Sequence, residues 1–314
     1  MAVHPGHLVA GAKLYVRSSP VWAAAAFVET LTSLCMTPIV AFIGAKGGTL
    51  KSACTLSVGT ELARRGHRVA LVDCDPQATT TRALPTRQTD GSEAPLTTVP
   101  DPLVAESVCV ELEQVTAGGG SLSVFRSGAP FWKAQRAAVT THIRRGTTDV
   151  DLVLVDTVPV LGDIALAAAE AADLVVIPTA PTADDLDAVD HVVAAIQESV
   201  DRHKRIRIVL TKAISGRRNT REALQLLRDK YAELVYPVVI PHRTTGETAN
   251  MYLRPAVLYD AIVGDGTLTA AYQALADHIA RDVALGTVAH PNAPTDTRST
   301  PRPRVKGRAA RRTP

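Results

Sequence analysis

The sequence predicts an α/β protein with a doubly wound, mostly parallel sheet that carries helices on both faces. The first observation is a series of short apolar runs, rich in β-branched residues, that lack the strict alternation of half-exposed strands. The second is that segments of helical length separate several of these runs. Alternating strands and helices favour parallel pairing, because each helix returns the chain to the same edge of the sheet.

Seven strands are expected in order along the chain. They cover residues 38–44, 68–75, 122–128, 151–157, 173–179, 206–212 and 236–241.

Four helices are expected between and after these strands. The first spans Ser52–Arg65 and stops before Gly66, a residue that favours a helix end. The second spans Asp185–Val200 and has one apolar face. Thr220 is expected to cap the third, and the last spans about residues 267–285.

Composition divides the chain into three parts. Residues 1–36 form an extension of unknown order, and Met36 offers an alternative translation start directly before the first expected strand. Residues 37–286 form the α/β domain, with a surface loop at 85–101 that is rich in Pro, Thr and Gly. Residues 287–314 form a basic, proline-rich tail that we expect to be disordered.

Charge and cysteine content restrict the function classes. The net charge is only +3, yet the tail from Thr297 onward contains seven basic residues and no acid. The four cysteines form no CxxC pair, which excludes a zinc or disulfide framework. No run reaches the length of a membrane span, so we expect a cytoplasmic protein.

The stretch "IVAFIGAKGGTLKSA" at 39–53 has the parts of a phosphate-binding loop. Its glycines, Gly47 and Gly48, allow backbone amides to approach a phosphate, while Lys51 and Ser52 supply the usual cation and Mg²⁺ ligand. The ordinary pattern G-x-x-x-x-G-K-[ST] nevertheless fails at Ala45 and at Leu50. The pattern alone therefore leaves a nucleotide site and a chance match equally open.

Three aspartates strengthen the nucleotide hypothesis. Asp73 and Asp75 end the second strand in "LVDCDPQ", and Asp156 ends the fourth in "LVDTVP". Ligands of open α/β sheets bind at the carboxyl ends of strands, where these acids and the Lys-Ser pair would meet. Each aspartate alone could equally cap a strand or a helix.

The motifs "KGGTLKS", "LVDCDPQ" and "LVDTVP" resemble the deviant Walker A, Walker A′ and Walker B motifs of ParA-type partition ATPases, relatives of MinD. Three further segments, "ADLVVIPTAPTADDL", "VVIPHRTTGETA" and "RPAVLYDA", resemble the same family, so the likeness extends from Thr37 to Leu285. The resemblance implies a P-loop NTPase fold of the deviant Walker A type, with ATP and Mg²⁺ as cofactors.

The resemblance also implies roles for individual residues. Lys46 matches the signature lysine that reaches the partner's nucleotide in an ATP-bound homodimer, and Lys51 matches the lysine that contacts its own phosphates. Asp75 matches the acid associated with the attacking water. The remaining matches are Ser52, Asp73 and Asp156 for Mg²⁺, Pro241 beside adenine, and Gly47, Gly48, Thr49, Leu50 and Ala53 in the nucleotide loop.

Four positions depart from the family pattern: Leu50, Ala53, Val158 and His242. If position 50 requires a positive φ, leucine there would cost about 1–2 kcal/mol. Family members with leucine at this position favour a negative φ instead, and this is what we expect. In that case Leu50 packs beneath the loop and tunes turnover without stopping it.

The family binds DNA without sequence preference, which requires Lys and Arg side chains that displace counterions from phosphates. Expected contacts are Arg217, Arg218 and Arg221 in the domain and Arg304, Lys306 and Arg308 in the tail, drawn from a wider basic set that includes Lys204, Arg205 and Arg207. Aromatic residues make up 4% of the chain, so base stacking is not expected.

The resemblance therefore implies a weak, partner-stimulated ATPase that dimerises on ATP, associates with the nucleoid and partitions plasmid or chromosomal DNA with a ParB-like protein. An ATP-binding regulator or cargo-positioning ATPase with little or no hydrolysis is the alternative. A membrane-positioning function like that of MinD is not expected, because the C-terminal tail has prolines and almost no apolar face.

Overall fold

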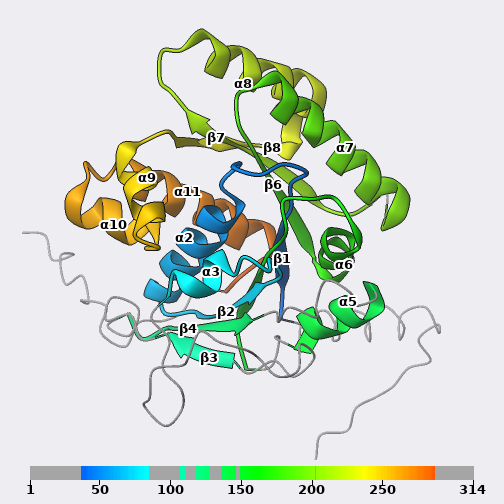
Figure 1. Cartoon of the computed structure of the whole chain (residues 1–314), viewed down its shortest axis with the longest axis vertical. Coiled ribbons are helices and arrows are strands. Elements are labelled where there is room, and N and C mark those ends of the chain that lie inside the picture. Colours follow the sequence, from blue (N-terminus) through cyan, green and yellow to red (C-terminus); the bar gives the residue numbers. More distant parts are fainter. Residues whose placement is uncertain are drawn as a thin grey trace, which may run out of the picture.

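An eight-stranded sheet forms the centre of the protein (Figure 1), in the order β3-β4-β2-β5-β1-β6-β7-β8. The computed structural model describes residues 37–84, 107–110, 118–126, 136–145, 149–201 and 203–286. The strands are β1 (Ile39–Phe42), β2 (Arg68–Asp73), β3 (Ser107–Val110), β4 (Ser121–Arg126), β5 (Leu152–Asp156), β6 (Leu174–Thr179), β7 (Ile206–Ala213) and β8 (Val235–Pro241). Every neighbouring pair is parallel except β3 with β4. The predicted fold class and all seven predicted strands are confirmed, and β3 is an additional antiparallel edge strand.

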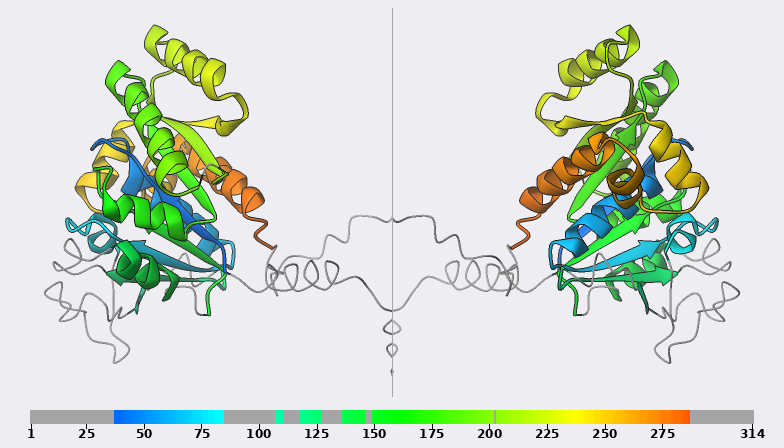
Figure 2. Two further views of the ribbon diagram at one scale, coloured as in Figure 1. Left: turned by 90° about the vertical axis from the view of Figure 1, so that its right-hand side faces the viewer. Right: turned by 90° about the vertical axis from the view of Figure 1, so that its left-hand side faces the viewer.

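Helices cover both faces of the sheet, so the fold has three layers (Figures 1 and 2). One face packs against α2 (Lys51–Arg64), α9 (Thr244–Met251), α10 (Ala256–Val263) and α11 (Thr267–Asp282). The other packs against α5 (Arg136–Arg145), α6 (Asp163–Ala171), α7 (Ala183–Ser199) and α8 (Arg218–Tyr231). The short α3 (Thr79–Arg82) follows β2, and a 3-10 turn (Ala232–Leu234) precedes β8.

Strand β1 shows why the apolar runs do not alternate. Val40 and Phe42 are buried against the α2 side, while Ile39 and Ala41 are buried against the α6 and α7 side. A strand that is covered on both faces needs apolar residues at every position.

The position of β1 within the sheet determines where the candidate site lies. β1 lies between β5 and β6, and the chain first builds the sheet on one side of β1 and then on the other. Such a reversal leaves a crevice at the carboxyl ends of the strands. Register places Asp156 beside both Phe42 and Asp73 at that edge.

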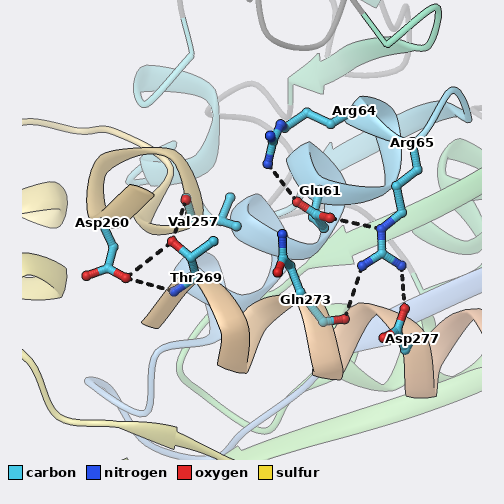
Figure 3. A network of polar contacts seen from close by, with 8 residues as sticks. All are labelled: Glu61, Arg64, Arg65, Val257, Asp260, Thr269, Gln273 and Asp277. Atoms are coloured by element: carbon cyan, nitrogen blue, oxygen red, sulfur yellow. Dashed lines mark hydrogen bonds and ion pairs between the residues drawn. The ribbon is translucent and has the colours of Figure 1, made fainter. Parts of the chain in front are cut away.

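Polar contacts fix α2 against the C-terminal helices (Figure 3). Arg65 at the end of α2 forms ion pairs with Asp277 of α11 and, at 2.9 Å, with Glu61 of α2 itself. Asp260 of α10 accepts a hydrogen bond of 2.9 Å from the backbone amide of Thr269 in α11. The ion pair of Arg65 with Asp277 holds α2, the helix that begins at the phosphate-loop lysine, against α11, and the Asp260 contact joins α10 to α11.

The expected helices are present, but their details differ. Thr220 does not cap α8: it lies in the first turn of this helix, its hydroxyl accepts a hydrogen bond of 3.1 Å from the Ile214 amide, and Arg217 is the N-cap residue. The hydroxyl thus serves the loop before the helix. Helices α3, α5, α6, α9 and α10 were not predicted.

Within the described part of the chain, no helix has the length and apolar character needed to cross a bilayer. The expectations for residues 1–36, 85–101 and 287–314 lie outside the described residues.

Candidate functional site

The segment from Ile43 to Leu50 joins β1 to α2 and forms the predicted phosphate loop. Gly48 adopts a left-handed conformation with φ +79°, which glycine enters without steric cost. The N-cap residue of α2, Leu50, makes no side-chain capping hydrogen bond, although helix ends normally have such partners. The first amides of this helix therefore face the site as donors for an anion.

Leu50 corrects our expectation of a negative φ. It is the N-cap residue of α2 and has φ 68° and ψ 28°, in the left-handed region. The half-buried side chain packs against the core on the α2 side. A leucine in this conformation costs about 1–2 kcal/mol of backbone strain, so packing and strain oppose one another at this position.

Lys51 is buried and its ammonium group points back over the loop. Nζ donates a hydrogen bond of 2.9 Å to the carbonyl oxygen of Lys46. Burial lowers the pKa of Lys51, while the charges of Asp156 and Asp75 oppose this change. No described carboxylate forms an ion pair with this ammonium group. A buried cation in this situation gains most from a bound anion.

Asp73 and Asp156 are register neighbours at the ends of β2 and β5, and both are fully buried. Asp73 Oδ2 accepts two bonds of 2.8 Å from Thr81, one from the amide and one from the hydroxyl. Asp156 Oδ2 accepts a bond of 2.6 Å from the Thr80 hydroxyl. Burial raises the pKa of both carboxyl groups, and for Asp73 the charge of Asp156 adds to the effect.

Asp75 lies between this pair and the open cavity. Its backbone amide donates to Asp73 Oδ1 at 3.1 Å, and its own Oδ1 accepts a bond of 2.8 Å from the Gln77 amide. These bonds fix the turn after β2 and leave the side chain among the residues that line the cavity. The position suits a group that orients a water molecule beside a bound phosphate.

The residues present fit a Mg²⁺ ion that is held jointly with a nucleotide. Ser52 lines the cavity, and the buried Asp156 Oδ1 has no hydrogen-bond partner among the described residues. The described residues contain no cluster of three or more His, Cys, Asp or Glu side chains that would bind a metal unaided. Mg²⁺ in nucleotide sites commonly takes few protein ligands and completes its shell with phosphates and water.

A cavity of about 220 Å³ opens above the N-terminus of α2. Predicted residues that line it are Gly47, Gly48, Leu50, Lys51, Ser52, Ala53 and Asp75. The remaining lining residues, which were not predicted, are Leu56, Thr79, Thr80, Ala83, Pro159, Asn250, Leu253 and Arg254. The threonine run after "LVDCDPQ" and the arginine in "RPAVLYDA" were the available signals for three of these.

Several predicted residues are not among those that line the cavity. Thr49 is buried, and its carbonyl oxygen lies 3.1 Å from the Thr211 hydroxyl of β7. Pro241 ends β8, where it pairs with Ala213 of β7. Lys46 points to the first turn of α7, where Nζ lies 3.0 Å from Asp184 Oδ2. The roles given to these residues remain predictions.

The basic residues of the domain differ in how far ion pairs and hydrogen bonds with other residues occupy them. Arg207 pairs with Asp282 at 2.8 Å, Arg205 also bonds to Asp282, and Lys204 bonds to the carbonyl oxygen of Ala172. By contrast Arg217, Arg218 and Arg221 are exposed at the start of α8. Of these three, Arg218 alone has an ion-pair partner among the described residues, Glu222 at 2.7 Å. Arg304, Lys306 and Arg308 lie outside the described residues.

Comparison with known proteins gives one family match and several relatives. The model of an AAA domain family matches residues 37–212. The chromosome-partitioning ATPase Soj of Thermus thermophilus is 31% identical over 64% of this chain and 80% of its own length. The sporulation initiation inhibitor protein Soj of Bacillus subtilis is 26% identical over 72% of this chain and 92% of its own length.

Solved structures support the same fold. The ATP complex of a Cyanothece McdA variant superposes with a TM-score of 0.62 at 13% identity, covering 81% of this chain and 99% of McdA. The Mg-ADP complex of MinD from Pyrococcus horikoshii superposes with a TM-score of 0.53 at 17% identity, covering 78% of this chain and 96% of MinD. At these identities the superpositions establish the fold alone.

Proposed function

The chain belongs to the ParA and Soj family of partitioning ATPases, and from this premise we propose that it is a DNA-segregating switch. In this proposal ATP and Mg²⁺ bind at the cavity above α2, the ATP-bound chain forms a homodimer through Lys46, and the dimer binds DNA without sequence preference. A ParB-like partner then stimulates hydrolysis and releases the dimer from DNA.

The observation that supports the nucleotide site most strongly is the convergence of three elements at one cavity. The uncapped N-terminus of α2, the buried Lys51 and the Asp75 carboxylate all face it. Lys51 and the helix amides would offset charge that develops on a transferred phosphoryl group. Asp75 would orient the attacking water, and Ser52 with Asp156 would hold the metal and its waters. Mg²⁺, when bound, would supply further neutralisation of phosphate charge.

The proposed DNA contacts rest on the exposed arginines at the start of α8. Cations at a helix N-terminus oppose the helix dipole, so helix stability does not explain their placement. Arg217 and Arg221 have no side-chain partner within the described part of the chain. The tail cations would add to this surface. Each cation that neutralises a phosphate contributes about one unit to the salt slope of DNA binding.

Leu50 supports one alternative, an ATP-binding regulator or cargo-positioning ATPase with little or no hydrolysis. The left-handed leucine directly precedes Lys51, so strain is stored where the phosphates would bind. Nucleotide binding without turnover, in the presence of both DNA and the partner, would favour this alternative.

ATPase assays on the wild type and Asp75→Ala test the proposal. We expect slow hydrolysis in the wild type, stimulation by DNA and the partner, and loss of at least about 100-fold in the variant. Unchanged hydrolysis in Asp75→Ala would contradict the assigned role.

DNA binding is tested by the triple variants Arg217/Arg218/Arg221→Gln and Arg304/Lys306/Arg308→Gln. The salt slope should fall in each by about three units if every residue contacts a phosphate.

A further inference from the structure

The C-terminal end of α9 and the turn that leads to α10 form one wall of the nucleotide cavity. Asn250, Leu253 and Arg254 all line the cavity together with the phosphate loop. They come from a segment about two hundred residues away from that loop in the sequence, so the fold brings them there. Figure 1 shows α9 and α10 beside α2 on the same face of the sheet.

Backbone contacts hold this turn in one shape. The Tyr252 amide donates to the carbonyl oxygen of Thr248 at 3.0 Å, and the Arg254 amide donates to that of Ala249 at 2.8 Å. Leu253 between them has φ 50°, a conformation that leucine adopts only when its surroundings impose it. Pro255 follows directly and fixes the backbone on the other side of Arg254.

Arg254 places a positive charge at this wall, and no acidic side chain of a described residue forms an ion pair with it. Its side chain is exposed. By contrast Arg243, which does not line the cavity, lies 3.8 Å from Asp265. Among the residues that line the cavity, the basic side chains are Lys51 and Arg254 and the acidic side chain is Asp75. The cavity therefore presents a cation from each of two elements, α2 and the α9–α10 turn.

We propose that Arg254 binds the phosphate oxygens of the nucleotide held by the loop at residues 46–53. The inference rests on the proposed function and extends it, because it adds a phosphate-binding residue outside the Walker motifs. A guanidinium group suits this task, since its planar N–H donors bond two phosphate oxygens at once. Nucleotide phosphates bound in this way would connect α2 to α9 and α10 through a charged contact.

Nucleotide affinity in three variants of the full chain tests the proposal. Arg254→Gln removes the charge, Arg254→Lys keeps the charge but loses the planar fork, and Arg228→Gln removes an exposed arginine of α8 that does not line the cavity. We expect Arg254→Gln to raise the Kd for ATP and for ADP about tenfold. Arg254→Lys should recover part of the loss, and Arg228→Gln should match the wild type. Because Arg254 is exposed, the melting temperature of Arg254→Gln should stay close to that of the wild type.

Salt separates a phosphate contact from a packing effect. If Arg254 contacts phosphate, the ratio of the Kd of Arg254→Gln to that of the wild type should fall towards one as salt rises. A ratio that is independent of salt and is not reduced in Arg254→Lys would overturn the proposal, as would an equal Kd for Arg254→Gln and Arg228→Gln. If the wild type binds and hydrolyses ATP while Arg254→Gln is unaffected, this inference alone fails. A wild type that binds no ATP would overturn the proposed function as well.

Discussion

Lys46 Nζ lies 3.0 Å from Asp184 Oδ2, so the lysine expected to reach a partner subunit is paired with the first turn of α7 in its own chain. Both side chains are exposed, with 40% of Lys46 and 81% of Asp184 accessible to solvent. Exposed ion pairs contribute about 0.2–1 kcal/mol, so the pair is easily exchanged for another partner of Lys46. If Lys46 contacts nucleotide across a dimer interface, Asp184 competes with that contact.

Asp184→Asn should therefore favour the ATP-bound dimer. We expect the dimer dissociation constant in ATP to fall by up to about fivefold, the equivalent of one exposed ion pair. Analytical ultracentrifugation across protein concentrations measures it. The matched control is Glu222→Gln, which breaks the exposed Arg218–Glu222 pair on α8 and should leave the constant unchanged. An unchanged constant in Asp184→Asn would show that the intramolecular pair does not compete with dimerisation.

Leu50 allows strain and packing to be measured separately. Leu50→Ala removes the packed side chain and keeps the unfavourable left-handed backbone, so it should destabilise the protein by about 1 kcal/mol. Leu50→Gly removes both the side chain and the strain, and it should be more stable than Leu50→Ala by about 1 kcal/mol. Urea unfolding of the three proteins measures both steps. Equal stability of the alanine and glycine variants would argue against strain at this position, and turnover in Leu50→Gly would show whether the strain affects hydrolysis.

The strands and the acids at their ends were predictable because the signals lie within short segments. Asp73 and Asp156 each follow a continuous apolar run, and parallel pairing places both at one edge. The φ of Leu50 was not predictable, because the left-handed conformation depends on how the loop closes over α2, which propensity alone does not encode. Arg254 lies within the segment "RPAVLYDA", yet its place at the cavity depends on the packing of α10 against α2 and of α9 against α10.

Strand β3 was missed for a related reason. It has only four residues, Ser107–Val110, and pairs antiparallel with β4 at the sheet edge. Short edge strands lack the continuous apolar run by which covered strands are recognised. Helix α6 was missed although it is rich in buried alanine, because a segment that is apolar on nearly all sides lacks a helical period.

Cys54 and Cys74 should resist alkylation in the native protein. Burial, followed by the charge of Asp156, raises the pKa of Cys54 to about 12, and burial raises the pKa of Cys74 well above its usual range. The thiolate is the reactive species, so at about pH 8 both residues should react with iodoacetamide more than about 100-fold slower than in the unfolded chain. Peptide mapping with and without concentrated urea measures the labelling of each cysteine. Rapid native labelling at Cys54 would show that the core around α2 opens readily.

Asp73 should make the protein free of nucleotide and Mg²⁺ less stable as pH rises. Burial and the charge of Asp156 raise its pKa from 3.8 to about 7, and burial raises that of Asp156 to about 6. Between about pH 4 and 7 the folded state therefore binds more protons than the unfolded state, and the free energy of unfolding falls as pH increases. Asp73→Asn removes one of these protonation sites.

The stability of Asp73→Asn relative to the wild type should therefore increase with pH across this window, by up to about 4 kcal/mol. Urea unfolding at several pH values in the absence of nucleotide and Mg²⁺ measures this difference. Asp151→Asn is the control, because the partly exposed Asp151 is hydrogen-bonded to Arg68 and its pKa is lowered. That variant should lose stability relative to the wild type as pH rises through the acidic range, which is the opposite sign. Parallel profiles for the wild type and Asp73→Asn would mean that Asp73 is already ionised in the folded protein at low pH.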